Sequence, residues 1–239
     1  SVDGSSVSGV DAPRFGFLPS AGLTFFAANT GALPSWIDMM NLSAEVSLTG
    51  NSRFSSNYAK NYYLTSNLFN MGAIVRSNVP NTRLEWEKKA QFDAALDLSL
   101  YKHMVDLQFN YFYANSYDLL LDRNISAVYG SSLYYDNTAS ISSQGYELAL
   151  RLNPVHTKNF DWSISGNIST VKSTVESLGN AQTEDIIEFT AYNEDDAQVI
   201  TRVGSSPYEF YGYQTDGIYA TTAEAQAAGL KNAAGKAYQ

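Results

Sequence analysis

The chain has 239 residues and no cysteine, which excludes a disulfide scaffold and thiolate metal sites. Its formal net charge of −9 is opposite to the basic character that nucleic-acid binding needs, so no nucleic-acid partner is expected. Charged residues make up 16% and aromatic residues 13%, a balance that suits barrel walls with polar loops and equally an extracellular β-sandwich.

The sequence has no apolar run long enough for a transmembrane helix, which needs about 18 residues. A barrel strand crosses a membrane with only about 9–11 residues, half of which face the lumen. The first residues also lack the basic start and apolar core of a signal peptide. We therefore expect a mature, truncated or internal segment, in which any membrane crossing is made by strands.

The first two predicted strands cover residues 14–26 and 41–49, where apolar residues occupy every second position. Successive side chains of a strand point to opposite faces, so each segment has one apolar and one polar face. The connection between them, residues 28–40, is expected to contain one helical turn at residues 34–38.

The third predicted strand, residues 84–100, has the clearest two-faced pattern in the chain. Its even positions are apolar with Lys88 as the exception, and its odd positions are polar with Ala95 as the exception. The segment is far longer than the usual strand of about 5–6 residues. Long two-faced strands repeated in series are typical of a transmembrane β-barrel.

Three more strands of the same design are predicted at residues 104–117, 143–153 and 160–172. The apolar phase is expected to face lipid, and it includes Leu96, Leu98, Phe109 and Ile164. The polar phase is expected to face a wet lumen or a plug, and it includes Asp97, Gln108, Asn110 and Ser165. Arginine is therefore expected to be costly at Leu96 and tolerated at Ser99.

The connections alternate in length along the chain. Short turns are predicted at residues 101–103 and 153–159, and long loops at 50–83, 118–142 and 173–239. Short turns on one side and long loops on the other are typical of outer-membrane barrels, whose short turns are periplasmic. Aromatic residues fall near both expected interfaces: Phe160 and Trp162 at the periplasmic rim, and Tyr113 and Tyr117 at the outer one, with Lys88 beyond it.

No catalytic motif occurs in the sequence, neither HExxH, GxSxG nor a Walker A loop. The two histidines, His103 and His156, fall in predicted turns of different hairpins. Glu85, Glu87 and Asp97 share one face, which fits a wet lumen better than acid–base catalysis. We therefore predict no catalytic residue, no metal, no cofactor and no enzymatic activity.

Two stretches of the predicted loop 173–239 are candidate contact sites. Residues 183–198 are rich in Asp and Glu, so they either bind calcium or form a solvated loop. Residues 208–219 carry Tyr and Phe that either stack on sugar rings or pack within the loop. Residues 221–229 read as a short helix that ends at a glycine.

Several short motifs together resemble the SusC/RagA-like TonB-dependent transporters, in that family's order and across most of the chain. They are Gly16-Phe17-Leu18-Pro19-Ser20, Leu48-Thr49-Gly50-Asn51, Leu84-Glu85-Trp86-Glu87, Asp118-Leu119-Leu120-Leu121, Gly145-Tyr146-Glu147-Leu148, Phe160-Asp161-Trp162 and Phe210-Tyr211-Gly212-Tyr213. The resemblance implies the C-terminal part of a barrel of about 22 strands, with the family's plug domain and TonB-binding segment absent from this chain.

The resemblance also implies a function: import of an oligosaccharide or peptide through the bacterial outer membrane. The implied partners are a SusD-like surface lipoprotein, TonB (through regions outside this chain) and outer-membrane lipid. It assigns no substrate-binding residue, because the contact residues of such transporters lie in variable loops. Two alternatives remain open: a β-sandwich adhesin or carbohydrate-binding module, and a β-structured glycan hydrolase. Dependence on detergent separates the transporter from both.

Overall fold

The computed structural model describes residues 1–68, 71–131, 133–179, 185–189, 198–212 and 221–229. The chain divides into two units, Ser1–Ile186 with Ile200–Glu209, and Ile187–Val199 with Phe210–Gln239. The first unit contains a large antiparallel sheet. The second contains the helix α1 (Thr222–Ala227), which lies inside the segment predicted to form a short helix.

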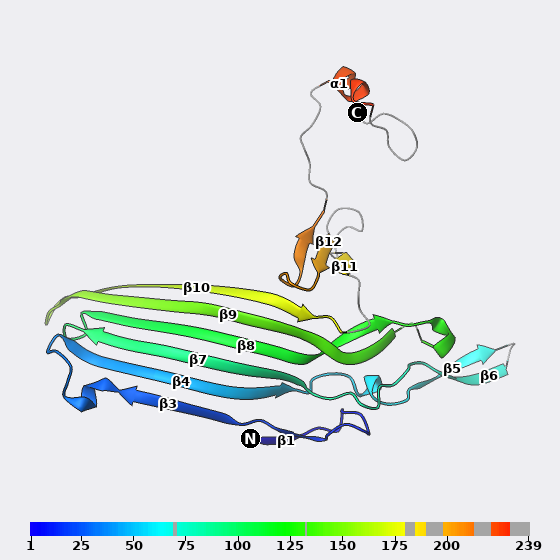
Figure 1. Cartoon of the computed structure of the whole chain (residues 1–239), viewed down its shortest axis with the longest axis horizontal. Helices are drawn as coiled ribbons and strands as arrows, with labels where there is room; N and C mark the ends of the chain where they lie inside the picture. Colours follow the sequence, from blue (N-terminus) through cyan, green and yellow to red (C-terminus); the bar gives the residue numbers. More distant parts are fainter. Residues whose placement is uncertain (69–70, 132, 180–184, 190–197, 213–220, 230–239) are drawn as a thin grey trace. The chain divides into compact units, whose positions relative to one another are not determined.

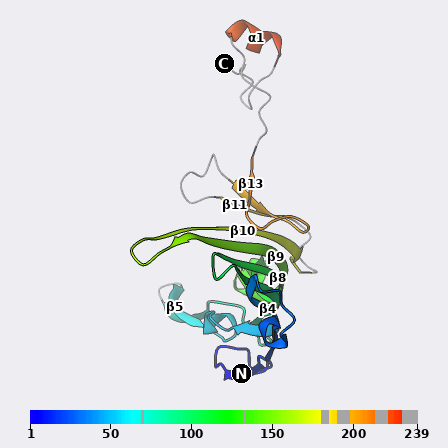
Figure 2. The ribbon, with the colours of Figure 1, turned by 90° about the vertical axis from the view of Figure 1, so that its left-hand side faces the viewer.

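The large sheet has six strands that lie side by side in one curved layer, in the order β10-β9-β8-β7-β4-β3 (Figures 1 and 2). Their bounds are β3 Ser20–Phe26, β4 Ile37–Asn51, β7 Glu87–Leu100, β8 Val105–Asn124, β9 Leu133–His156 and β10 Asp161–Ser177. Every neighbouring pair is antiparallel. Because β3 and β10 are its end strands, the described sheet is an open wall and not a closed barrel.

The turn between β7 and β8 is held in an unusual backbone conformation. Tyr101, Lys102 and His103 have φ angles of 55°, 59° and 61°, in the left-handed region that L-residues rarely enter. Side chains from outside the turn fasten it. The Asn153 amide donates to the His103 carbonyl at 2.7 Å, and the His103 N–H donates to the Asp38 carboxylate at 3.1 Å.

Strands β8 and β9 are longer than predicted, and this corrects the expected loop at residues 118–142. Their ladder runs from Val105↔Leu152 to Asn124↔Leu133, with register shifts around Asp118. Only residues 125–132 connect them, including the 3₁₀ turn η3 (Ala127–Tyr129). Beyond Ser116, β8 carries the consecutive leucines 119–121 on both of its faces, and the paired part of β9 is largely polar. Hydrophobic alternation therefore does not mark these strand ends, although backbone hydrogen bonds continue the ladder.

The loop expected at residues 50–83 also contains regular structure. It includes the 3₁₀ turn η2 (Ser56–Tyr58) and a hairpin of β5 (Tyr63–Leu68) and β6 (Met71–Arg76). The hairpin register pairs Tyr63 with Arg76 and Leu68 with Met71.

The strand predicted from residue 84 begins at Glu87. Leu84 and Trp86 are only 0% and 7% exposed, although the alternation predicted them on the apolar face of the strand. The Leu84 carbonyl accepts from the Gly9 N–H at 2.8 Å, and the Trp86 indole N–H donates to the Ser8 hydroxyl at 3.1 Å. Leu84 and Trp86 form the core of what we call the loop layer, in which residues 8–11 of the N-terminal segment cover residues 82–86.

The N-terminal prediction, one strand at residues 14–26, is wrong in detail. β1 (Val2–Gly4) pairs with β2 (Phe15–Phe17), and β3 starts only after Pro19. Proline lacks the N–H that a ladder needs, which explains the break. The predicted helical turn at residues 34–38 is replaced by a turn that leads into β4, and a 3₁₀ turn η1 lies earlier, at Ala27–Thr30.

The stretch 173–239 is not one uninterrupted loop. β10 continues to Ser177, and the short strands β11 (Ile186–Phe189), β12 (Gln198–Thr201) and β13 (Glu209–Tyr211) follow. Residues 204 and 205 add to the end of β10: the Val175 N–H donates to the Ser205 carbonyl at 2.9 Å, and the Gly204 N–H to the Val175 carbonyl at 2.8 Å. Val175 is buried there.

Candidate functional site

The outward face of the six-stranded sheet carries a continuous apolar row. Cross-strand partners in a ladder share a face, so the registers alone identify its members. The row crosses all six strands as Phe25, Leu42, Leu96, Phe109, Leu148 and Ile168.

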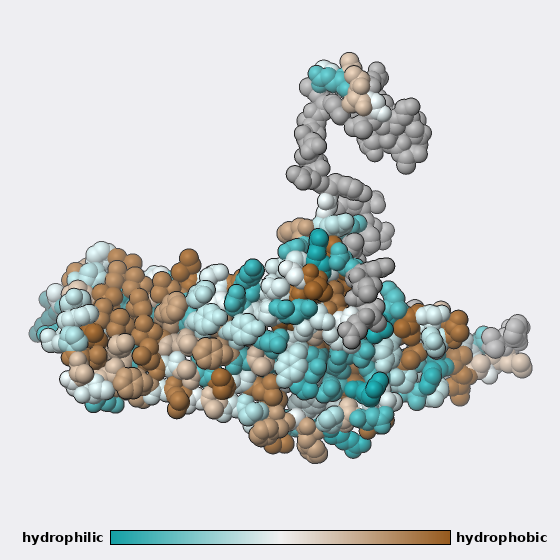
Figure 3. Space-filling view, viewed as in Figure 1, coloured by the Kyte–Doolittle hydropathy of each residue, from teal (hydrophilic) through white to brown (hydrophobic). Residues whose placement is uncertain are grey.

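Rows on both sides of this one extend it into an apolar band. Toward the short turns the same face carries Leu100, Val105, Leu152 and Ile164, and toward the loops it carries Val46, Phe92 and Tyr113. From Phe92 to Leu100 the band is about nine residues long, close to the 9–11 that a membrane strand needs. Figure 3 shows hydrophobic side chains gathered over the turn-side half of the sheet and hydrophilic ones over the loop-side half.

The apolar band is exposed rather than covered by protein. Leu23, Ile164 and Ile168 are 83%, 48% and 68% exposed. An apolar patch that crosses six strands is far larger than soluble monomers expose, so this face requires an apolar partner.

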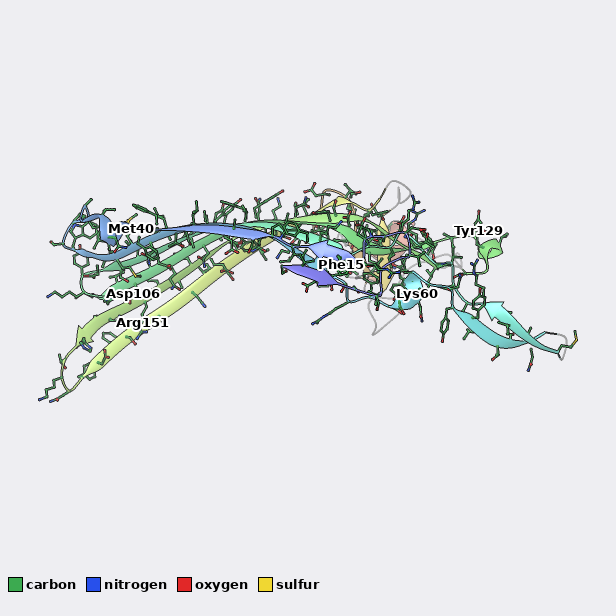
Figure 4. All side chains as sticks on the ribbon, turned by 90° about the horizontal axis from the view of Figure 1, so that it is seen from below. Phe15, Met40, Lys60, Asp106, Tyr129 and Arg151 are labelled. Atoms are coloured by element: carbon green, nitrogen blue, oxygen red, sulfur yellow. The ribbon has the colours of Figure 1, made fainter. Side chains whose placement is uncertain are left out.

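The opposite face of the same strands is polar. One row reads Asn41, Asp97, Gln108, Ala149 and Asn167, and another reads Ser43, Ala95, Asn110, Glu147 and Ser169. Near the short turns, Asp106 and Arg151 are cross-strand neighbours on this face (Figure 4). The structure thus brings Asp97, Gln108, Asn110 and Ser165 onto one face, and Leu96, Leu98, Phe109 and Ile164 onto the other.

The polar face has an acidic character. Glu45 lies directly opposite Asp93, an arrangement of like charges that destabilises a sheet unless other groups offset it. The Gln91 amide donates to the Asp93 carboxylate at 2.7 Å, and the Ser99 hydroxyl donates to Asp106 at 2.7 Å. Such a face can hold water and hydrogen-bond a polar or cationic partner.

The three carboxylates singled out in the sequence do not form one acidic group. Glu85 precedes β7 and binds Lys88 at 2.9 Å. Glu87 accepts from the Leu120 N–H at 3.0 Å and from the Asn51 amide at 2.6 Å. Glu87 and Asp97 both stand at odd positions of β7, ten residues apart, whereas Glu85 lies outside the strand. The expectation that all three line one wall is therefore wrong for Glu85, whose charge helps to hold the loop layer.

The two histidines lie at separate turns. His103 is 3.1 Å from Asp106 and His156 is 3.5 Å from Asp161, each pair in a different hairpin. Among the described residues no group of three His, Cys, Asp or Glu side chains is placed to hold a metal. The described helix is also too short and too polar to cross a membrane.

Lys88, the exception in the apolar phase, lies beyond the band. Its ammonium group contacts Glu85 at 2.9 Å and Asp118 at 2.8 Å, and lies 5.8 Å from the Tyr117 ring centre. Burial alone lowers the pKa of Lys88, but hydrogen bonds and charge attraction from Asp118 and Glu85 outweigh it and raise the pKa above its ordinary value. Lys88 therefore stays cationic at neutral pH and fastens the loop layer to β8.

Aromatic side chains lie at both edges of the apolar band. At the turn side, Phe160 and Trp162 are exposed, and Trp36 stacks on Tyr101 with ring centres 5.9 Å apart. At the loop side Tyr113 is 44% exposed. Aromatic rings at two levels of an apolar wall are typical of membrane interfaces.

Sequence reasoning missed the polar contacts that hold the loop layer. The Asn137 amide donates to the carbonyls of Glu85 at 2.9 Å and Asp118 at 2.7 Å, and its oxygen accepts from the Glu85 N–H at 2.9 Å. The Asn81 amide donates in the same way to the Tyr135 carbonyl at 3.1 Å. A single Asn in a polar stretch has no periodic signal, so nothing in the sequence marks these residues.

Two predicted contact sites fall largely outside the described residues. Of the acidic stretch 183–198, only residues 185–189 and 198 are described. Of the aromatic stretch 208–219, the described part includes Tyr208, Phe210 and Tyr211, which are 65%, 94% and 43% exposed.

No protein-family model matches the chain, but related proteins share its sequence and its fold. It is 26% identical over 237 residues to TonB-dependent receptor P26 of Formosa agariphila, covering 97% of this chain and 24% of that receptor. It is 24% identical over 165 residues to TonB-dependent receptor SusC of Bacteroides thetaiotaomicron, covering 66% of this chain and 15% of SusC.

Among solved structures, the RagAB peptide importer in the 'closed-closed' state superposes with a TM-score of 0.78 at 20% identity, covering 99% of this chain and 26% of that chain. The structure titled RagAB peptide transporter gives a TM-score of 0.74 at 20% identity, with 87% and 22% covered. This chain is SusC/RagA-like.

The likeness confirms the predicted all-β, antiparallel barrel-wall fold. The relatives are receptors and transporters and not enzymes, so the prediction that the SusC/RagA-like chain is not an enzyme is confirmed as well. The chain spans about a quarter of the length of the P26 receptor and of the RagAB importer chain that it matches.

Proposed function

We propose that the SusC/RagA-like chain forms part of the wall of an outer-membrane, TonB-dependent nutrient importer. The observation that carries this proposal is the two-faced sheet, with a band about nine residues long that is apolar outward and polar inward. In a bacterial outer membrane the band would lie in hydrocarbon, and the polar face would line the lumen or meet a plug domain.

The two end strands of the sheet support closure into a larger barrel. A membrane interior offers no water to satisfy free backbone N–H and C=O groups, so an open strand edge is unstable there. Since β3 and β10 end the described sheet, strands from elsewhere in the protein must pair with them. A barrel of about 22 strands meets this requirement and leaves a lumen wide enough for a plug.

The whole importer is proposed to work with two protein partners. A surface lipoprotein of the SusD type would cap the loop side, where β8 and β9 extend beyond the apolar band. TonB would act through parts of the protein outside these residues. The substrate is an oligosaccharide or a peptide: one relative is named SusC, and one structural neighbour is titled a peptide importer.

The runner-up, a soluble β-sandwich adhesin, is disfavoured by exposure. A sandwich buries its apolar face against a second sheet, whereas Leu23 and Ile168 are 83% and 68% exposed in the described structure. Sandwich strands are also short, while β9 has 24 residues. A glycan hydrolase would need a positioned acid pair, which Glu85, Glu87 and Asp97 do not provide.

Growth and uptake of a deletion strain test the proposed function. Cells that lack the full-length protein should fail to grow on either oligosaccharides or oligopeptides as the only nutrient, and the class lost identifies the substrate. Loss of TonB should give the same defect. Unchanged uptake of both nutrient classes by the deletion strain would contradict the importer assignment.

A further inference from the structure

A groove of about 450 Å³ lies on the outward face where β3, β4, β7 and β8 run side by side. It is lined mainly by outward-facing side chains of two neighbouring cross-strand rows. One row is Ala21, Val46, Phe92 and Tyr113, and the next is Leu48, Ala90 and Asn115. The alanines leave the hollow, because they stand beside larger side chains on the neighbouring strands.

The groove lies at the loop-side edge of the apolar band. Phe92 and Tyr113 are outward neighbours in one row, and the next row toward the loops carries the polar pair Asn115 and Ser142. The Asn115 side-chain oxygen is buried and has no hydrogen-bond partner among the described residues. Buried polar atoms are nearly always paired, so this acceptor is an unsatisfied polar group beside the groove.

A basic residue stands at the same level. Lys172 on β10 belongs to the outward row of Phe92 and Tyr113, through Gln144 on β9. The side chain is exposed, and no ion pair joins Lys172 to another described residue. The face therefore combines an apolar hollow with an unpaired polar acceptor at its loop-side end and a cation two strands beyond its β8 edge.

We propose that this groove binds one lipid of the outer leaflet, with a fatty acyl chain in the hollow and its headgroup toward Asn115 and Lys172. The inference rests on the proposed function, which places this face in the membrane with its loops outward. Its volume lies within the ~300–1,000 Å³ of sites that hold small molecules. A concave apolar wall contacts more of an acyl chain than a flat one, and Lys172 complements an anionic phosphate.

The test compares two matched alanine variants of the full-length protein, purified and placed in nanodiscs that contain outer-membrane lipid extract. Ala90→Phe fills the groove, whereas Ala44→Phe adds the same side chain to the outward face of β4, one row away. Native mass spectrometry then counts the lipid that remains bound after detergent exchange. The wild type and Ala44→Phe should each retain one lipid, and Ala90→Phe about tenfold less, as expected for roughly two lost methylene contacts.

The groove assignment would be overturned if all three proteins retained equal amounts of lipid, or if both variants lost equal amounts. Either result would show that lipid binding does not depend on the shape of the groove. Heat-shifted mobility in gels checks that Ala90→Phe folds, and Ala90→Leu replaces it if it does not. A fluorophore at Ala44→Cys with brominated lipids separates the two proposals, since the chain has no native cysteine. Absence of quenching refutes the membrane wall itself, whereas quenching with unchanged retention refutes only the groove.

Discussion

At the scale of single residues, position within the two-faced ladder decides what a substitution does. Leu96 lies in the middle of the apolar row, between Leu42 and Phe109. Ser99 lies on the polar face but is only 3% exposed and donates to Asp106. The expectation that Ser99 tolerates arginine is therefore weakened, because the pattern of alternation identifies a face and not the space available on it.

Leu96→Arg should impair assembly in the membrane. A charge on the lipid face near the midplane costs about 2–4 kcal/mol, whereas Gln108→Arg places the same charge beside Asp97 on the polar face. Reversible denaturant unfolding in lipid bilayers measures both. Similar losses of stability in the two variants would contradict the assigned faces.

Asn137 is predicted to hold the loop layer onto the sheet. Asn137→Ala removes a side chain that makes three hydrogen bonds to backbone groups, and each group left unpaired costs about 1–3 kcal/mol. Hydrogen exchange should accelerate in residues 84–86 and stay unchanged in β7. Asn124→Ala, at the exposed end of β8, is the matched control, and equal exchange in both variants would refute this role.

At the scale of elements, close approach between strands limits side-chain size. A Cβ added to Gly145 on β9 would lie 2.3 Å from the Thr170 carbonyl oxygen and 2.7 Å from the Phe112 ring. A Cβ added to Gly166 on β10 would meet nothing within 4 Å. The two glycines lie on neighbouring strands of one hairpin. Gly145 leaves no room for a larger side chain, whereas Gly166 does.

Gly145→Ala should destabilise the sheet by about 1–3 kcal/mol through overpacking. Gly166→Ala should be neutral or stabilising by about 0.4–1 kcal/mol, because the unfolded chain loses freedom. The midpoint of unfolding in lipid bilayers, measured for the wild type and for both variants, tests the two expectations. A Gly145→Ala protein as stable as Gly166→Ala would show that the close approach is not maintained.

The predictability of each element follows from its surroundings. Where one face meets an apolar medium and the other meets water, as at Leu96 and Asp97, alternation predicts both the strand and its faces. Where both faces are polar, as in β9 near Asn137, the same ladder gives no alternating signal. Leu84 and Trp86 continue the alternation of β7 but are buried by the N-terminal segment, a contact that spans 78 residues between Ser8 and Trp86.

At the scale of the whole molecule, the described sheet is a wall that is incomplete by itself. It exposes an apolar face and ends in β3 and β10, two features that promote aggregation in water. In the proposed importer, lipid would cover the apolar face and further strands would pair with the two end strands. The sheet would then depend on both for its stability, and its acidic face would line the enclosed lumen.

The most direct test of this account is a cysteine scan of nine consecutive positions in β7, residues 92–100, in the full-length protein reconstituted in lipid. Each cysteine is labelled with a probe that reports contact with lipid or with water. Strict alternation is expected, with a polar environment at the odd positions and lipid contact at the even positions Phe92, Ala94, Leu96, Leu98 and Leu100. Lipid-free readings at Leu96 and Leu98, or no alternation along the strand, would contradict it.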